Sequence, residues 1–153
     1  MTRRHVNWQQ RLSDVVREHR EQPFDFKTLN CLFWAFKGIE AVIDIDFMPD
    51  YEGKSETVLT GKKALKEIDG CNTVQEVLIK KLGGELQPIA FARPGDIVFL
   101  NGQLDNFYVQ QELVLFGPTP GICYATGMNS LFLGETGLVE APTIGLDSAL
   151  WVS

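Results

Sequence analysis

Cys31 is the residue best placed for nucleophilic chemistry. It opens the apolar run of residues 31–36 and follows Asn30, a favourable residue for capping the start of a helix. Free amides and the dipole at the start of a helix stabilise negative charge, so a cysteine at that position is favoured as the thiolate. The position predicts a candidate nucleophile, and the structural alternative is a small buried side chain.

A thiol nucleophile needs a base, and the chain contains two histidines, His5 and His19. Both precede Cys31, and both lie on or near the first predicted helix. His19 falls on the apolar stripe of that helix. Three roles stay open for it: a partner of Cys31, a buried structural histidine, or a contact for another protein.

The other polar residues predict no metal site and no cofactor. Cys71 and Cys123 are far apart in the chain, which fits neither a disulfide framework nor a metal-binding pair, so we expect both to fill the core. The carboxylates within residues 44–52 lack the glycine and the closing glutamate of a calcium-binding loop. No glycine cluster has the strand and helix context of a phosphate-binding loop.

Composition restricts the class of partner. The 153 residues include 14 basic and 20 acidic side chains, giving a net charge of −6, which argues against nucleic acid as the principal partner. The longest apolar run, residues 31–36, is far shorter than the roughly 18 residues of a membrane-spanning helix, so we expect no membrane insertion. The start of the chain lacks an apolar signal core, which argues against secretion by a cleaved signal. The three isolated cysteines indicate reduced thiols and therefore synthesis in the cytoplasm.

Helices are predicted in the first half of the chain. Apolar positions at helical spacing predict a helix over residues 7–21, and Thr28 or Asn30 can cap a second, almost wholly apolar helix that ends near residue 43. An acidic loop follows over residues 44–51. Two further helices are predicted over residues 60–68 and from the capping signal at Thr73 to residue 82.

Strands are predicted in the second half, where glycine and proline separate short apolar runs. These runs are residues 97–100, 113–116, 122–125 and 131–133. Helices followed by strands predict one α+β domain over residues 1–153, with N-terminal helices packed on a C-terminal antiparallel sheet. The helical part covers about residues 7–82 and the strand-rich part about residues 93–153.

A set of short motifs in fixed order resembles an uncharacterised family of phage and prophage tail-gene proteins. That family is similar to a divergent branch of the NlpC-type, papain-like cysteine peptidases. The resemblance spans nearly the whole chain, with extra length at residues 101–118. The motifs that carry it are Trp8 with Arg11 and Leu12, Pro23-Phe24, Asn30-Cys31, residues 94–98, Gly121-Ile122, residues 137–139 and residues 149–152.

The resemblance implies a papain-like NlpC-type fold with Cys31 at the nucleophile position. It also implies that the general base is missing, because such enzymes carry a histidine two residues before the glycine of the second-strand motif. Thr119 stands at that position here, two residues before Gly121. Relatives often read His-Asp-Cys where this chain reads Leu29-Asn30-Cys31, so a second ionisable neighbour is absent.

These features lead us to expect a non-catalytic structural component of the phage tail, located in the virion at or near the tail tip. The expected partners are the hub, the distal tail protein and the central fibre. Phe107 and Tyr108, in the added segment, are the candidate interface residues. Two alternatives stay open: an active peptidase or amidase that cuts peptidoglycan during genome entry, and a tail assembly factor absent from the virion.

Overall fold

A computed structural model describes residues 3–101 and 116–153, and it has helices first and strands second. The helices are α1 (Trp8–His19), α2 (Cys31–Ile43), α3 (Met48–Tyr51), α4 (Val58–Ala64), the π-helix η1 (Leu65–Asp69) and α5 (Val74–Leu82). The strands are β1 (Gln87–Pro88), β2 (Ile97–Leu100), β3 (Thr119–Tyr124), β4 (Asn129–Gly134), β5 (Gly137–Pro142) and β6 (Ser148–Leu150). Two 3-10 turns, η2 (Ile89–Phe91) and η3 (Thr143–Gly145), complete the described elements.

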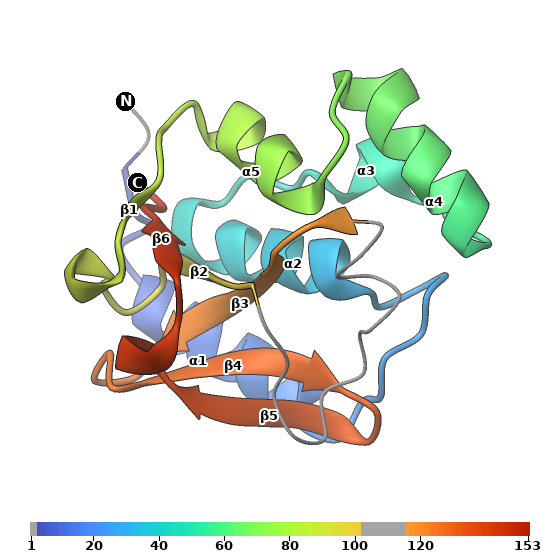
Figure 1. Ribbon diagram of the computed structural model, residues 1–153. Helices are drawn as coiled ribbons and strands as arrows, with labels where there is room; N and C mark the ends of the chain where they lie inside the picture. The colour runs from blue at the N-terminus through green and yellow to red at the C-terminus, as the bar shows by residue number, and fades with distance from the viewer. Residues whose placement is uncertain (1–2, 102–115) are drawn as a thin grey trace.

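The six strands form one antiparallel sheet in the order β1-β6-β2-β3-β4-β5. Helix α2 packs on β3 and β4, α1 packs beside α2, and α5 contacts β3, so the helices share one face of the sheet (Figure 1). The predicted α+β arrangement of N-terminal helices on a C-terminal antiparallel sheet is confirmed.

Helix α2 is the centre of the core, as its apolar sequence predicts. Eleven of its 13 residues are buried. It begins at Cys31 because the Asn30 side chain caps it, accepting a hydrogen bond from the Phe33 amide at 3.0 Å. It ends where Asp44 takes a left-handed conformation, with φ of 59°.

A close approach between α2 and the sheet depends on Gly38. A Cβ atom at this position would lie 2.4 Å from Cδ1 of Ile122 in β3. Only a residue without a side chain leaves the helix this near the strand.

Several elements differ from the sequence prediction. Residues 48–51 form a short helix in place of a loop, because the ring of Tyr51 is buried and its hydroxyl bonds Asp69. Helix α4 begins before Thr60, since Thr57 caps it, and the turn then widens into η1 before Gly70. Of the predicted strand at residues 113–116, Phe116 alone is described, and it is buried but not in a strand.

The sheet also has a second, smaller core on its other face. Val98, Cys123 and Phe132 belong to it, and Ile89 and Leu146 from the segments around η2 and η3 pack there. Strands β1, β5 and β6 were not predicted, yet β6 lies inside the sheet between β1 and β2. No helix within residues 3–101 and 116–153 is long and apolar enough to cross a bilayer.

Candidate functional site

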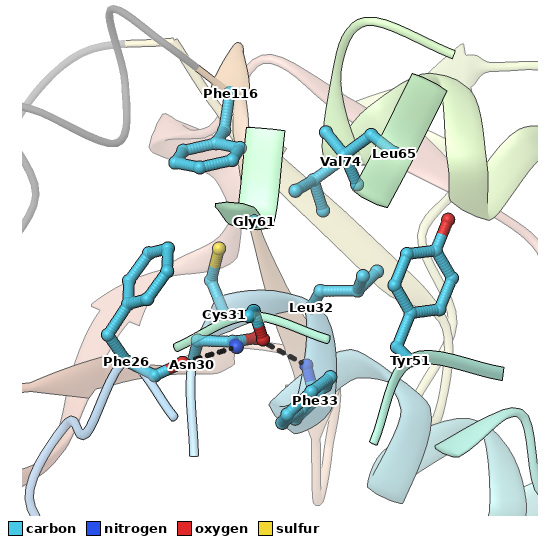
Figure 2. A pocket seen from close by; sticks show the side chains of 11 residues that line it. Phe26, Asn30, Cys31, Leu32, Phe33, Tyr51, Gly61, Leu65, Val74 and Phe116 are labelled. Atoms are coloured by element: carbon cyan, nitrogen blue, oxygen red, sulfur yellow. Dashed lines mark hydrogen bonds between the residues drawn. The ribbon is translucent and has the colours of Figure 1, made fainter. Parts of the chain in front are cut away.

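Cys31 lies at the first turn of α2, facing a small cavity that we call the Cys31 cavity. The residue is 8% exposed, and the cavity volume is about 30 Å³, room for a molecule the size of water. Figure 2 shows its sulfur directed toward Gly61, between the rings of Phe26 and Phe116. The lining residues are Phe26, Asn30, Cys31, Leu32, Phe33, Tyr51, Ser55, Gly61, Leu65, Val74 and Phe116.

The loop before α2 holds this cavity in shape through Asn30. Besides capping Phe33, the Asn30 side chain donates to the Phe26 carbonyl oxygen at 3.0 Å, as Figure 2 shows. Helix α4 closes the other side at Gly61, where a Cβ atom would lie 2.9 Å from Cζ of Phe26. Both contacts fix the Phe26 ring beside the thiol.

Ser55 adds a polar atom that sequence reasoning did not single out. Its hydroxyl oxygen is buried, lines the Cys31 cavity and has no hydrogen-bond partner, which sets it apart among buried side-chain polar atoms of the described residues. A lone serine in a polar stretch of sequence carries no signal for such a position. A buried hydroxyl without a partner costs about 1 to 3 kcal/mol.

The histidines do not line this cavity. His19 is buried in α1, where its Nδ1 lies 2.7 Å from the Val15 carbonyl oxygen and its ring packs 5.7 Å from the Trp34 ring. His5 accepts a hydrogen bond from the Asn7 amide at 3.0 Å. These contacts fit a buried structural role for His19. They do not fit a role as the partner of Cys31, because His19 is not among the residues that line the Cys31 cavity.

Among the described residues, no carboxylate, lysine or arginine lines the Cys31 cavity either. Tyr51 contributes its ring, while its hydroxyl donates to Asp69 Oδ2 at 2.5 Å. Burial, followed by this hydrogen bond and the charge of Asp69, raises the pKa of the Tyr51 hydroxyl above its ordinary range. Thr119, at the position where the resemblance places a histidine, is buried in β3 opposite Leu100 and is not part of the cavity wall.

The other candidate residues lie elsewhere in the structure. Cys71 and Cys123 are buried, and burial is the main cause that raises the pKa of each thiol. In residues 3–101 and 116–153, no group of three or more histidine, cysteine or acidic side chains is arranged to hold a metal ion. Phe107 and Tyr108 lie outside the described residues.

Comparison with known proteins identifies a family without an assigned activity. Residues 3–152 match the family described as a domain of unknown function (DUF6950), and the chain belongs to that family. No curated protein and no solved structure matches the chain.

Proposed function

We propose that this member of the DUF6950 family is a non-catalytic structural component of a phage tail, located at or near the tail tip. In this role it binds the hub, the distal tail protein or the central fibre. The observation that carries the non-catalytic part is that neither His5 nor His19 lines the Cys31 cavity; no carboxylate of residues 3–101 and 116–153 lines it either. Cysteine peptidases use a histidine as the activating base, and neither histidine of this chain lines the cavity that the Cys31 thiol faces.

The papain-like NlpC-type fold is part of the same proposal. Three features support it: a cysteine at the start of a buried central helix, packing of that helix on an antiparallel sheet, and the position of Thr119 at the start of strand β3. The tail location rests on the resemblance of the sequence motifs. Function follows from sites and not from folds, so the tail role needs its own test.

A second candidate, an active peptidase or amidase, is favoured by the position of Cys31. The sulfur lies at the amino end of a 13-residue helix and faces a cavity that also holds the unpartnered Ser55 hydroxyl. A serine hydroxyl at its ordinary acidity is a poor base, so this arrangement does not replace the missing histidine.

Mass spectrometry of purified virions tests the structural role. We expect the protein in intact particles at a constant ratio to the hub. Absence from mature particles, combined with failure of tails to assemble when the gene is deleted, would replace our proposal with the assembly factor.

Incubation of the purified chain with peptidoglycan tests the non-catalytic role. We expect no peptide release above the level of the matched variant Cys31→Ser. Release by the wild-type chain that is lost in Cys31→Ser would establish the peptidase and reject our proposal.

A further inference from the structure

A second hollow, well away from Cys31, lies between α1, residues 93–94 and the end of β3. We call it the Arg4–Arg93 pocket. Its volume is about 330 Å³, within the size range of small-molecule sites. The lining residues are Arg4, Trp8, Gln9, Leu12, Ser13, Arg93, Pro94, Tyr124 and Ala125.

Two guanidinium groups in this pocket share one carboxylate. Asp96 is fully buried behind them; its Oδ1 accepts from Arg4 at 2.9 Å, and both of its oxygens accept from Arg93. No aspartate or glutamate of the part of the chain that the structure describes lines the pocket itself. The wall therefore carries more positive than negative charge.

The environment of Arg4 is consistent with this excess of positive charge in the pocket wall. Burial lowers the pKa of Arg4 below its ordinary value, Asp96 opposes that shift, and the neighbouring Arg93 adds to it. The Arg4 guanidinium is held 4.4 Å over the Trp8 ring and also donates to the Pro94 carbonyl oxygen. A bound anion would offset the repulsion between the two guanidinium groups.

Arg93 has donor capacity left for a ligand. Its side chain is 43% exposed, and its Nε and Nη2 are used by Asp96 and Ser153. Its Nη1 makes no hydrogen bond to any described residue. A planar guanidinium with a free nitrogen at the rim of a pocket is suited to a carboxylate or phosphate oxygen.

The rest of the wall is suited to a polar ring. Gln9, Ser13 and Tyr124 bring an amide and two hydroxyl groups, whereas Trp8 and Leu12 bring apolar surface. A sugar ring combines hydroxyl groups at its edge with apolar C–H faces, so it matches such a mixed wall.

We propose that the Arg4–Arg93 pocket binds a small sugar that carries an oxyanion, either a carboxylate or a phosphate. The oxyanion pairs with Arg93 at the rim, and the ring lies against Trp8 and Tyr124. This site does not depend on Cys31 or on the tail role.

Nitrogen-15 NMR of the full chain tests the proposal directly. The Nε–H groups of Arg4 and Arg93 are both hydrogen-bonded, which favours their detection. We would titrate D-glucuronate, D-glucose 6-phosphate, D-glucose and inorganic phosphate. We expect saturable shifts of both signals with at least one charged sugar and none with D-glucose, and the sugar that binds identifies the carboxylate or the phosphate.

Two adjacent substitutions provide a matched pair. Gln9→Glu places a negative charge in the pocket, whereas Gln10→Glu adds the same charge one residue later, outside the lining. We expect Gln9→Glu to weaken binding by about fivefold or more and Gln10→Glu to stay within about twofold. Shifts with inorganic phosphate alone, shifts that do not saturate, or equal weakening in both variants would overturn the proposal.

Discussion

The indole nitrogen of Trp34 donates a hydrogen bond to the carbonyl oxygen of Leu131 at 3.0 Å, joining the central helix α2 to strand β4. Trp34 is fully buried. We expect Trp34→Ala to lower the free energy of unfolding by about 3 to 5 kcal/mol, because it removes a large core side chain. A denaturant titration measures this change. Trp34→Phe, which keeps a ring, is the control and should lose less; a loss below about 1 kcal/mol for Trp34→Ala would contradict the described core.

The raised pKa of the Tyr51 hydroxyl predicts that the folded protein loses stability at alkaline pH. Burial and the neighbouring Asp69 raise the pKa of its hydroxyl above the ordinary value of 10.0. Above pH 10 the unfolded chain releases this proton while the folded chain keeps it, so the folded state binds more protons and stability falls as pH rises. Below pH 10 this contribution is fully present.

Urea titrations between pH 9 and pH 11.5 measure the effect. We expect Tyr51→Phe to remove up to about 1.4 kcal/mol per pH unit of the alkaline slope, the value for one proton. Tyr124→Phe, which removes a tyrosine hydroxyl outside the Asp69 network, is the matched control for loss of a hydroxyl group. The prediction fails if Tyr51→Phe and wild type lose stability in parallel.

Cys31→Ser should leave phage infectivity and particle assembly near wild type. Neither histidine lines the Cys31 cavity, so we expect that the thiol is not activated for catalysis. Plaque counts and electron microscopy of the mutant phage give the result. Loss of infectivity in particles that contain a normal amount of folded mutant protein would point to catalysis instead.

The double substitution Phe107→Ala with Tyr108→Ala should weaken incorporation into tails without unfolding the isolated domain. The sequence places these two aromatic side chains next to each other in a polar segment. Each of them forgoes about 1.5 to 3 kcal/mol of favourable burial free energy if it stays in water, so we expect both to contact another tail protein. Phe91→Ala is a suitable control, since Phe91 is a described aromatic residue that is 59% exposed. Incorporation of the double variant at wild-type levels would reject these two residues as the docking element and make helix α1 the next candidate.

Local signals were enough to predict the central helix. Asn30 can cap a helix through its own side chain, and the apolar run after it can be buried only in a core, so both the start and the burial of α2 follow from neighbouring residues. The capping signal at Thr73 was equally local, and Thr73 accepts a hydrogen bond from the Glu76 amide at 3.1 Å. Such bonds form between residues three positions apart, which is why a short window of sequence contains them.

Tertiary structure alone decided the elements whose partners are far away in the chain. Strand β6 has three residues, too few for an alternating pattern, and it exists because Ala149 pairs with Val98 and Gln87 on its two sides. Asp96 likewise accepts a hydrogen bond from Arg4, which lies 92 positions away in the chain. The pocket beside these two residues follows from that contact. Pairings over such separations depend on how the whole chain folds, because the cost of closing the loop is met by the complete core and not by the residues of the pair.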